Sequence, residues 1–353
     1  MLMNDSARHQ TNWRMPDEGA PHAATWMAFG ADVELWGTKL LPVIRNNLAS
    51  VAKTITVYEP VKMLVREEDY DIAARLCGPS VSLVVQPLDD VWLRDTGPVF
   101  VTNPAGQLGA VGFNFNGWGN KPQPYARKQH LYARDAKVAE HLAGAAQAIF
   151  LKADLVLEGG GIEVDGEGTA IITESCVLNP NRNPDVPKAK CEDELSRLLG
   201  LDKIIWLPGC HNKDDITDGH TDFYARFTSP GVVVAGLEMD TSFDDYEVTR
   251  EHLAILRKST DARGRHLKVV ELQGPSTVRP KYGNDDGFAA GYINFYVCNG
   301  AVIAPEFGDA AADRNARDKL RDLYPDREII QLDIDGIAAG GGIHCVTQQQ
   351  PRL

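Results

Sequence analysis

The sequence has no apolar stretch long enough to cross a membrane, and no apolar signal-peptide region near its N-terminus. Its longest apolar runs, residues 231–237 and 301–304, have the length of a strand, whereas a membrane helix needs about 20 apolar residues. We therefore expect a cytoplasmic protein that does not bind membranes. Residues 1–12 are polar and predict a flexible tail, followed by a single domain over residues 13–353.

Cysteine is scarce, with six residues in a chain of 353 and no Cys-x-x-Cys pair. This spacing argues against a zinc finger or ribbon and, in a reducing compartment, against disulfides. Basic residues are fewer than acidic ones. The chain has 36 Lys and Arg and 49 Asp and Glu, which gives a net charge of −13. Such a balance argues against a nucleic-acid partner, whose phosphates need a basic face.

Glycine-rich phosphate loops are also absent, which argues against a doubly wound nucleotide-binding sheet. What is present is a repeat of elements. Five helix-like stretches begin about sixty residues apart, and a short apolar or β-branched run follows each one. The stretches are 67–77, 129–143, 189–200, 246–259 and 311–323, and the runs are 81–85, 148–151, 203–207, 267–272 and 328–332. Further strand-like runs lie between them, at 98–102, 169–173, 231–235 and 301–304. Five β-rich units with one helix each predict a closed, five-bladed α/β arrangement.

Uncommon polar residues occupy comparable places in these units, some 15–25 residues after each helix. The segments are 92–95, 158–161, 219–222, 283–285 and 340–345. In a ring of similar blades, equivalent positions meet at one end of the axis. We therefore expect Asp95, Glu158, His220, Asp222 and Cys345 to form one site.

Cys345 ends a turn made by Gly340–Gly342 and does not lie inside an apolar strand. Glycines allow the backbone to approach a ligand closely, and a thiol placed there can act as a nucleophile. We expect the neighbouring His344 to be structural, because consecutive residues of an extended chain point to opposite sides.

His220 and Asp222 are two residues apart and share one face if the chain is extended there. With Cys210 and His211 upstream, the same pattern also leaves a metal site open.

Two further carboxylates complete the set. Glu158 follows the apolar run 155–157, where a carboxylate at the end of a strand needs a partner such as a histidinium. Asp95 lies in the acidic segment 89–98 beside Arg94, which also permits a local salt-bridge cluster.

One thiol, one imidazole and three carboxylates exceed what acyl transfer by a cysteine needs. The two additional carboxylates would repel the anionic intermediate of acyl transfer, so they are expected to serve a different reaction. A guanidinium is planar, cationic and rich in N–H donors, and therefore matches two carboxylates beside a thiolate.

Six motifs lie between Trp92 and Pro351, within a resemblance that runs from about Met15-Pro16 to Pro351: WxRDxGP, EGG-x3-VDGEGT, N-x-NRNP, GHxD, NFY and GGGIHC…QQQP. In these motifs the chain resembles the agmatine deiminase (Porphyromonas-type peptidylarginine deiminase) family. The resemblance implies the pentein fold, an α/β-propeller of five ββαβ-type units around a central site.

The resemblance also implies a role for each matching residue. Cys345 would be the nucleophile, His220 the acid and base, Glu158 its partner, Asp95 and Asp222 the guanidinium clamp, and Trp92 a wall of the pocket. The implied reaction converts agmatine to N-carbamoylputrescine and ammonia through a thiouronium on Cys345, a step of putrescine biosynthesis. We expect no metal and no other cofactor.

Residues 28–36, Glu163 and Phe223-Tyr224 depart from the usual agmatine deiminase pattern. These segments are expected to shape the distal end of the pocket, so they leave the physiological guanidine open. Deimination itself is unaffected, because the motifs that carry the chemistry are intact.

Asp32, Glu34 and Trp36 make the N-terminal segment acidic and aromatic, which favours a cationic or neutral tail. We rank agmatine first, another alkylguanidine second, and free or peptidyl arginine third. Three alternatives stay open: an amidinotransferase with the same residues, a binding protein for cationic ligands, and a metallohydrolase. The oligomeric state is also open, and a homo-oligomer is compatible with the sequence.

Overall fold

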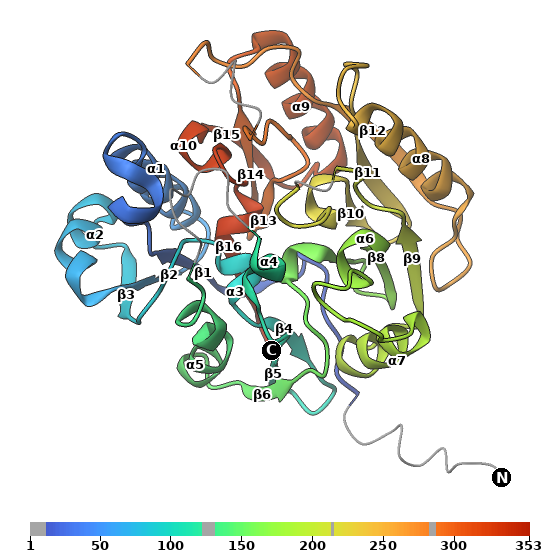
Figure 1. Ribbon diagram of the computed structural model, residues 1–353, viewed down its shortest axis with the longest axis horizontal. Coiled ribbons are helices and arrows are strands. Elements are labelled where there is room, and N and C mark those ends of the chain that lie inside the picture. Colours follow the sequence, from blue (N-terminus) through green and yellow to red (C-terminus); the bar gives the residue numbers. More distant parts are fainter. Residues whose placement is uncertain (1–11, 122–130, 213–214, 282–286) are drawn as a thin grey trace.

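Five small sheets surround a central axis in the computed structural model, which describes residues 12–121, 131–212, 215–281 and 287–353 (Figure 1). Within these ranges, four sheets have three strands and one has four. The predicted ring of five α/β units is therefore confirmed. The predicted tail, apart from Asn12, and the segment 283–285 lie outside the described residues.

Four sheets share one topology, in which a hairpin is followed by a helix and by a third strand parallel to the second. A parallel neighbour requires such a crossover helix, because a tight turn can only reverse the chain. The first of these sheets contains β4 (Val99–Thr102), β5 (Leu108–Gly112), α5 (Val138–Ala145) and β6 (Ile149–Lys152), and the second contains β7 (Ile162–Val164), β8 (Thr169–Thr173), α7 (Lys188–Leu199) and β9 (Lys203–Leu207). The third contains β10 (Ala225–Ser229), β11 (Val232–Leu237), α8 (Asp245–Lys258) and β12 (Lys268–Gln273), and the fourth contains β13 (Tyr296–Cys298), β14 (Ala301–Glu306), α9 (Ala310–Leu323) and β15 (Glu328–Asp333).

The fifth sheet joins the two ends of the chain. β16 (Thr347–Pro351) pairs antiparallel with β1 (His22–Phe29), and β2 (Val61–Val65) and β3 (Val81–Val85) continue the sheet in parallel. This pairing closes the ring by backbone hydrogen bonds. It also fixes the position of Cys345, which lies two residues before β16.

The crossover helix of this fifth sheet is α1 (Val33–Ile55), which was not predicted. It joins β1 to β2 and so holds the place that α5, α7, α8 and α9 hold elsewhere. The predicted stretch 67–77 corresponds to α2 (Tyr70–Cys77), an additional helix between β2 and β3, so its assignment as the helix of the first unit was wrong. Pro42 and Gly37, the latter with φ of 68°, interrupt the helical pattern of α1 and concealed it.

The other helices agree better with prediction. α7, α8 and α9 begin and end within one residue of the expected positions. Asp309 caps α9 by accepting two backbone amides, and Gly200 ends α7 in the left-handed conformation with φ of 69°. α5 begins at Val138 and not at 129, after a short turn at Asp135–Lys137.

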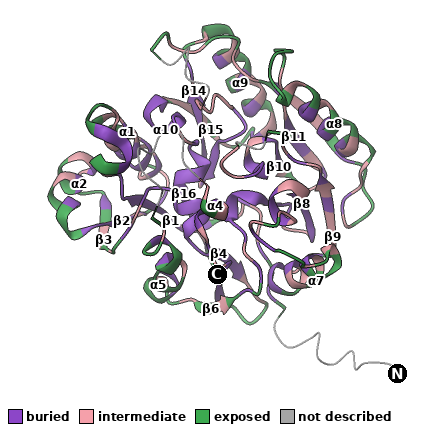
Figure 2. Ribbon diagram, viewed as in Figure 1, coloured by how far each residue is buried: buried purple, intermediate pink, exposed green. Residues whose placement is uncertain are grey.

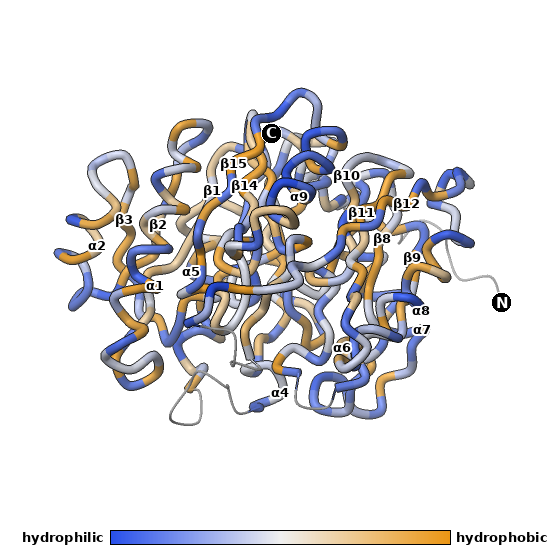
Figure 3. Tube along the Cα trace, turned by 90° about the horizontal axis from the view of Figure 1, so that it is seen from above, coloured by the Kyte–Doolittle hydropathy of each residue, from blue (hydrophilic) through white to orange (hydrophobic). Residues whose placement is uncertain are grey.

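Burial falls from the axis to the rim (Figure 2). All residues of β5 and β8 are buried, whereas at least half of the residues of β12 and β15 are half-buried and the helices expose their outer faces. The view at 90° shows a flattened molecule, with α4 (Gly117–Asn120) at one face and the C-terminus at the other (Figure 3). No helix in the described ranges is long and apolar enough to cross a membrane.

Candidate active site

Four short helical turns meet near the axis, and each directly precedes the first strand of a sheet. They are α3 (Leu93–Thr96), η4 (Gly159–Gly161), η5 (Thr221–Phe223) and η6 (His344–Val346), before β4, β7, β10 and β16. α3 contacts both η4 and η6, and η4 contacts η5. The ring therefore brings the five predicted site residues, from Asp95 to Cys345, to one place.

Gly160 lies at the centre of this place. Its amide donates a hydrogen bond of 3.0 Å to Asp95 Oδ1. A Cβ on Gly160 would lie 2.6 Å from His220 Nδ1, 2.9 Å from Asp95 Oδ1 and 3.1 Å from Asp222 Oδ2. Glycine is thus required for these three side chains to converge. The preceding residues 155–157 form a connection and not the predicted strand.

Glu158 and Arg182 hold the far side of His220. Glu158 Oε2 lies 3.1 Å from His220 Nε2, and Arg182 Nε donates to Glu158 Oε1 at 2.7 Å. Burial alone would raise the pKa of Glu158, but Arg182 and His220 lower it to about 2. Burial opposes the imidazolium, yet Asp95, Cys176 and Glu158 raise the pKa of His220 well above its ordinary value. The pair therefore rests as a carboxylate beside an imidazolium.

Cys345 lies on η6 with 6% of its surface exposed. Its Sγ is 3.8 Å from Asp222 Oδ2 and 3.4 Å from Asn294 Nδ2. Burial, together with Asp222 and Asp95, raises the pKa of the Cys345 thiol well above its ordinary value. A protonated thiol is thus the resting form, and a cation placed between Cys345 and the two carboxylates would favour the thiolate.

Gly341 and Gly342, which precede Cys345, allow protein side chains to pack closely against the backbone. A Cβ on Gly341 would lie 2.5 Å from Trp92 Cζ3, and one on Gly342 would lie 2.1 Å from Asn294 Oδ1. Trp92 is 3% exposed. Its ring therefore packs against the loop that carries the thiol.

His344 points toward the site, although the opposite orientation was expected. Because η5 and η6 are helical turns, the side-chain alternation of extended chain does not apply to either. Asp222 Oδ2 lies 2.7 Å from His344 Nδ1; burial would raise the pKa of Asp222, but His344 lowers it. His344 Nε2 lies 2.8 Å from Glu18 Oε2, and Arg94 Nη2 donates to the same oxygen at 3.1 Å. Arg94 thus belongs to a buried network and not to a local cluster with Asp95.

Asn294 is a site residue that was not predicted. It lies two residues before β13 and is fully buried. Its Oδ1 accepts the backbone amides of His344 at 2.9 Å and Cys345 at 3.4 Å. This position matches that of the four turns, because it directly precedes the first strand of the remaining sheet. The NFY motif contained the signal.

Trp118 is a second unpredicted residue, and it lies in the left-handed turn α4. The four residues of this turn have φ of 71°, 52°, 73° and 59°. This conformation is unfavourable for a residue with a side chain, so packing must maintain it. A Cβ on Gly119 would lie 2.5 Å from Asn181 Cγ. The indole of Trp118 donates to Asp95 Oδ2 at 2.9 Å, so the strained turn orients a predicted site carboxylate.

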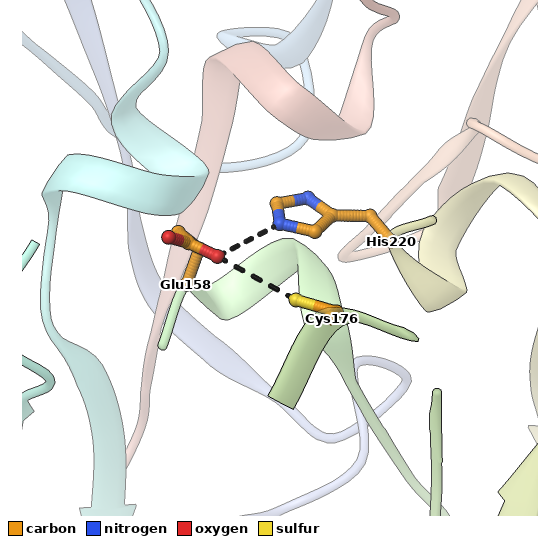
Figure 4. Close-up of side chains that lie close together, drawn as sticks. All are labelled: Glu158, Cys176 and His220. Carbon is orange, nitrogen blue, oxygen red and sulfur yellow. Dashed lines mark hydrogen bonds and ion pairs between the residues drawn. The ribbon is translucent and has the colours of Figure 1, made fainter. Parts of the chain in front are cut away.

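The alternative metal site does not assemble. Cys210 Sγ contacts a backbone carbonyl at 3.5 Å, and His211 Nε2 lies 3.9 Å from an exposed carboxylate. Across the described part of the chain, one group of His, Cys and acidic side chains brings its ligand atoms together, namely Glu158, Cys176 and His220 (Figure 4). Cys176 was not among the predicted site residues.

The residues expected to recognise the tail of the substrate already have partners. Asp32 caps α1 and pairs with Arg66 at 3.1 Å, so its charge is offset. Trp36 donates to Asp90 at 2.8 Å, and its ring centre lies 5.9 Å from that of Trp92. The N-terminal segment therefore reaches the site through two neighbouring indole rings, tilted by 42° to each other, and not through the Asp32 carboxylate.

Two other departures from the family pattern also have structural partners. Glu163 is buried and accepts from Arg226 Nε at 2.6 Å, and Arg226 Nη2 donates to Glu18 at 2.9 Å. Tyr224 donates from its hydroxyl to Asp245 at 3.1 Å. Neither side chain is hydrogen-bonded to the five predicted site residues. The departures at Glu163 and Tyr224 therefore change the packing around the site and not the site itself.

Comparison with known proteins gives consistent matches along the whole chain. Residues 14–351 match the model of the Porphyromonas-type peptidyl-arginine deiminases. A curated protein of Streptomyces coelicolor, provisionally named as an agmatine deiminase, is 43% identical over 346 residues, covering 96% of this chain and 99% of its own. The agmatine deiminase of Stutzerimonas stutzeri is 38% identical over 372 residues, covering 98% of this chain and 97% of its own.

A solved structure has the same architecture. The agmatine deiminase of Enterococcus faecalis superposes with a TM-score of 0.87 at 30% identity, covering 97% of this chain and 96% of its own. This likeness, with the five sheets of the ring, confirms the predicted α/β-propeller of ββαβ units.

Proposed function

Because this chain belongs to the Porphyromonas-type peptidyl-arginine deiminase family, we propose that it hydrolyses agmatine to N-carbamoylputrescine and ammonia. The agmatine deiminases of Stutzerimonas stutzeri and Enterococcus faecalis, which match over nearly the full length, support agmatine as the substrate. The observation that carries the proposal is the convergence of Asp95, His220 and Asp222 on Gly160, beside the thiol of Cys345.

Asp95 and Asp222 would bind the guanidinium. Asp222 Oδ1 is buried and has no hydrogen-bond partner among the described residues, which is costly unless a donor arrives. Burial raises the pKa of Asp95, so a bound cation would stabilise its ionised form. Two carboxylates facing a planar cation would also orient its carbon toward Cys345.

The bound cation would favour the thiolate of Cys345, and the thiol proton would pass to solvent because His220 is already protonated. The thiolate attacks the guanidinium carbon and forms a carbon–sulfur bond. Nδ1 of His220 lies on the Gly160 side, 3.7 Å from Asp95 Oδ1, whereas Nε2 contacts Glu158. His220 would therefore donate its Nδ1 proton to the departing nitrogen. Ammonia leaves, and an S-alkylthiouronium remains on the sulfur.

The second half of the reaction needs a base, and His220 is now neutral. It would take a proton from water, whose oxygen attacks the thiouronium carbon. Collapse of this adduct breaks the carbon–sulfur bond, and the hydroxyl proton of the adduct passes to the departing sulfur. This step restores the thiol and leaves the ureido product. Glu158, held by Arg182, would keep the imidazole in the orientation that both proton transfers require.

The test is to incubate the purified chain with agmatine and to measure ammonia and the ureido product. We expect equimolar formation of both, and a loss of about four orders of magnitude or more in Cys345→Ala, whose covalent nucleophile is gone. Ammonia release at the wild-type rate from Cys345→Ala would overturn the mechanism. No turnover of any guanidine by the wild-type chain would overturn the function.

A further inference from the structure

A buried thiol that the reaction does not use contacts the catalytic pair. Cys176 lies on α6 (Glu174–Val177), directly after β8, with no exposed surface. Its Sγ is 3.7 Å from Glu158 Oε2, the same oxygen that lies 3.1 Å from His220 Nε2. The three side chains come from separate segments and point toward one another (Figure 4).

The spacing of these atoms matches that of ligands around a small divalent ion. A tetrahedral Zn²⁺ with bonds of about 2.0 Å to nitrogen or oxygen and about 2.3 Å to sulfur holds neighbouring ligand atoms roughly 3.3–3.8 Å apart. Here Glu158 Oε2 lies 3.1 Å from His220 Nε2 and 3.7 Å from Cys176 Sγ, and all three atoms lie within 4.8 Å of one another. Thiolate, imidazole and carboxylate are also the donor types that Zn²⁺ prefers.

The charges around the three atoms can also accommodate a dication. Arg182 binds the other oxygen of Glu158 and leaves Oε2 free to coordinate. The charge of Arg182 is shared with Asp218, whose Oδ2 accepts from Nη1 at 2.8 Å. On binding, the Cys176 thiol and Nε2 of the His220 imidazolium would each give up one proton to solvent. Thiolate and carboxylate together would then balance the two charges of the ion.

We propose that Glu158, Cys176 and His220 form an inhibitory site for a divalent cation of the Zn²⁺ class. The inhibitory effect rests on the proposed function, whereas binding does not. An ion on Nε2 leaves the remaining proton on Nδ1, so the imidazole can no longer alternate between acid and base. The ion also takes Glu158 away from His220. An enzyme with an ion bound at this site therefore cannot turn over substrate. The ion inhibits the reaction, whereas the metal of a metallohydrolase promotes it.

Binding is tested by titrating Co²⁺, a spectroscopic substitute for Zn²⁺, into chelator-stripped Cys345→Ala, which lacks the nucleophilic thiol. We expect one tight site with a sulfur-to-cobalt charge-transfer band and the visible bands of a tetrahedral ion. Adding Cys176→Ala should abolish both. Adding Cys191→Ala should preserve them, since Cys191 is equally buried but lies on α7. Absence of the bands, or their survival without Cys176, would overturn the proposal, and neither result depends on catalytic activity.

Inhibition is tested with Zn²⁺ on the otherwise wild-type chain during agmatine turnover. We expect Cys176→Ala to need at least about tenfold more Zn²⁺ for half-inhibition, because one of three protein ligands is gone. Cys191→Ala should behave as the wild type, and EDTA should restore full activity to the zinc-inhibited enzyme. Equal sensitivity of the wild type and Cys176→Ala would overturn the inhibitory role.

Discussion

Asn294 Nδ2 lies 3.4 Å from Cys345 Sγ, while Oδ1 of the same side chain accepts the Cys345 amide at 3.4 Å. One buried amide therefore contacts both the backbone and the sulfur of the proposed nucleophile. A donor at this distance stabilises a thiolate, because the negative charge develops beside an N–H group. Asn294 is thus a positioning residue that also favours ionisation of the thiol.

We expect Asn294→Asp to slow the alkylation of the Cys345 thiol strongly, although asparagine and aspartate have almost the same shape. The aspartate keeps the acceptor Oδ1 but places a negative charge where the N–H was, and so raises the pKa of the thiol further. Alkylation by iodoacetamide near neutral pH should slow at least about tenfold, and its pH profile should move upward. Asn294→Ala, which adds no charge, should not shift the profile to the same extent. Equal profiles for the wild type and Asn294→Asp would contradict this role.

Trp118→Phe should lower kcat/KM for agmatine by about tenfold or more. Phenylalanine fills most of the same space but cannot donate to Asp95 Oδ2, so the carboxylate loses a fixed orientation. Trp206→Phe is a matched control, since its indole also donates to a carboxylate, that of Glu192, at 2.8 Å but next to α7. If both variants lost activity to the same extent, the loss would come from removing any indole, and the specific role of the Trp118–Asp95 hydrogen bond would be contradicted.

The turn that carries Trp118 illustrates what the sequence could and could not predict. In the segment Asn116 to Asn120, every residue except Trp118 is a glycine or an asparagine, and both types tolerate positive φ. A left-handed turn could therefore have been predicted here. The contact with Asp95 was not, because it depends on how the turn folds back onto α3. Arg182 is similar: it stands in the N-x-NRNP motif, but only the folded chain places it on Glu158.

The five predicted site residues could be grouped from the sequence because the repeat places each one before the first strand of a blade. Where that rule was not applied, a residue was missed, as with Asn294. The expected orientation of His344 was wrong for a different reason, because it assumed an extended chain where the structure has a helical turn. The expectation that His344 is structural stays a prediction. Local backbone conformation, which spacing alone does not determine, decided the orientation of that side chain.

Glu158 should make stability depend on pH in the acidic range. Its pKa is lowered from about 4.5 to about 2 in the folded chain, so the stabilisation is complete above the unfolded pKa and is lost as the pH falls toward 2. Between pH 5 and 3 this group alone should remove about 2 kcal/mol from the free energy of unfolding. Urea unfolding of Glu158→Gln should therefore show a shallower decline than the wild type over that interval. Glu140→Gln, at an exposed position of α5, should follow the wild type.

Asp32→Asn should leave the choice of substrate unchanged. The Asp32 charge is already offset by Arg66, and asparagine can cap α1 equally well. We therefore expect the ratio of kcat/KM for agmatine to that for arginine to stay within about twofold of the wild type. A large fall in the ratio would show that Asp32 contacts the tail of the substrate after all.

The wild-type chain should prefer agmatine to arginine by about a hundredfold or more in kcat/KM. Arginine adds an α-carboxylate, which must enter a site already lined by Asp95 and Asp222 and would be repelled by both. Arg182 and Lys121 are close to the site, but both are already paired with Asp218. Either cation would have to give up that ion pair to offset the charge of the α-carboxylate. The measurement is the initial rate of ammonia release over a concentration series of each substrate, with peptidyl-arginine and short alkylguanidines in parallel. Alkylguanidines should fall between the two, since they carry the guanidinium without the repelling group. A ratio near one, or a preference for arginine, would mean that cationic residues meet the tail where we expect none.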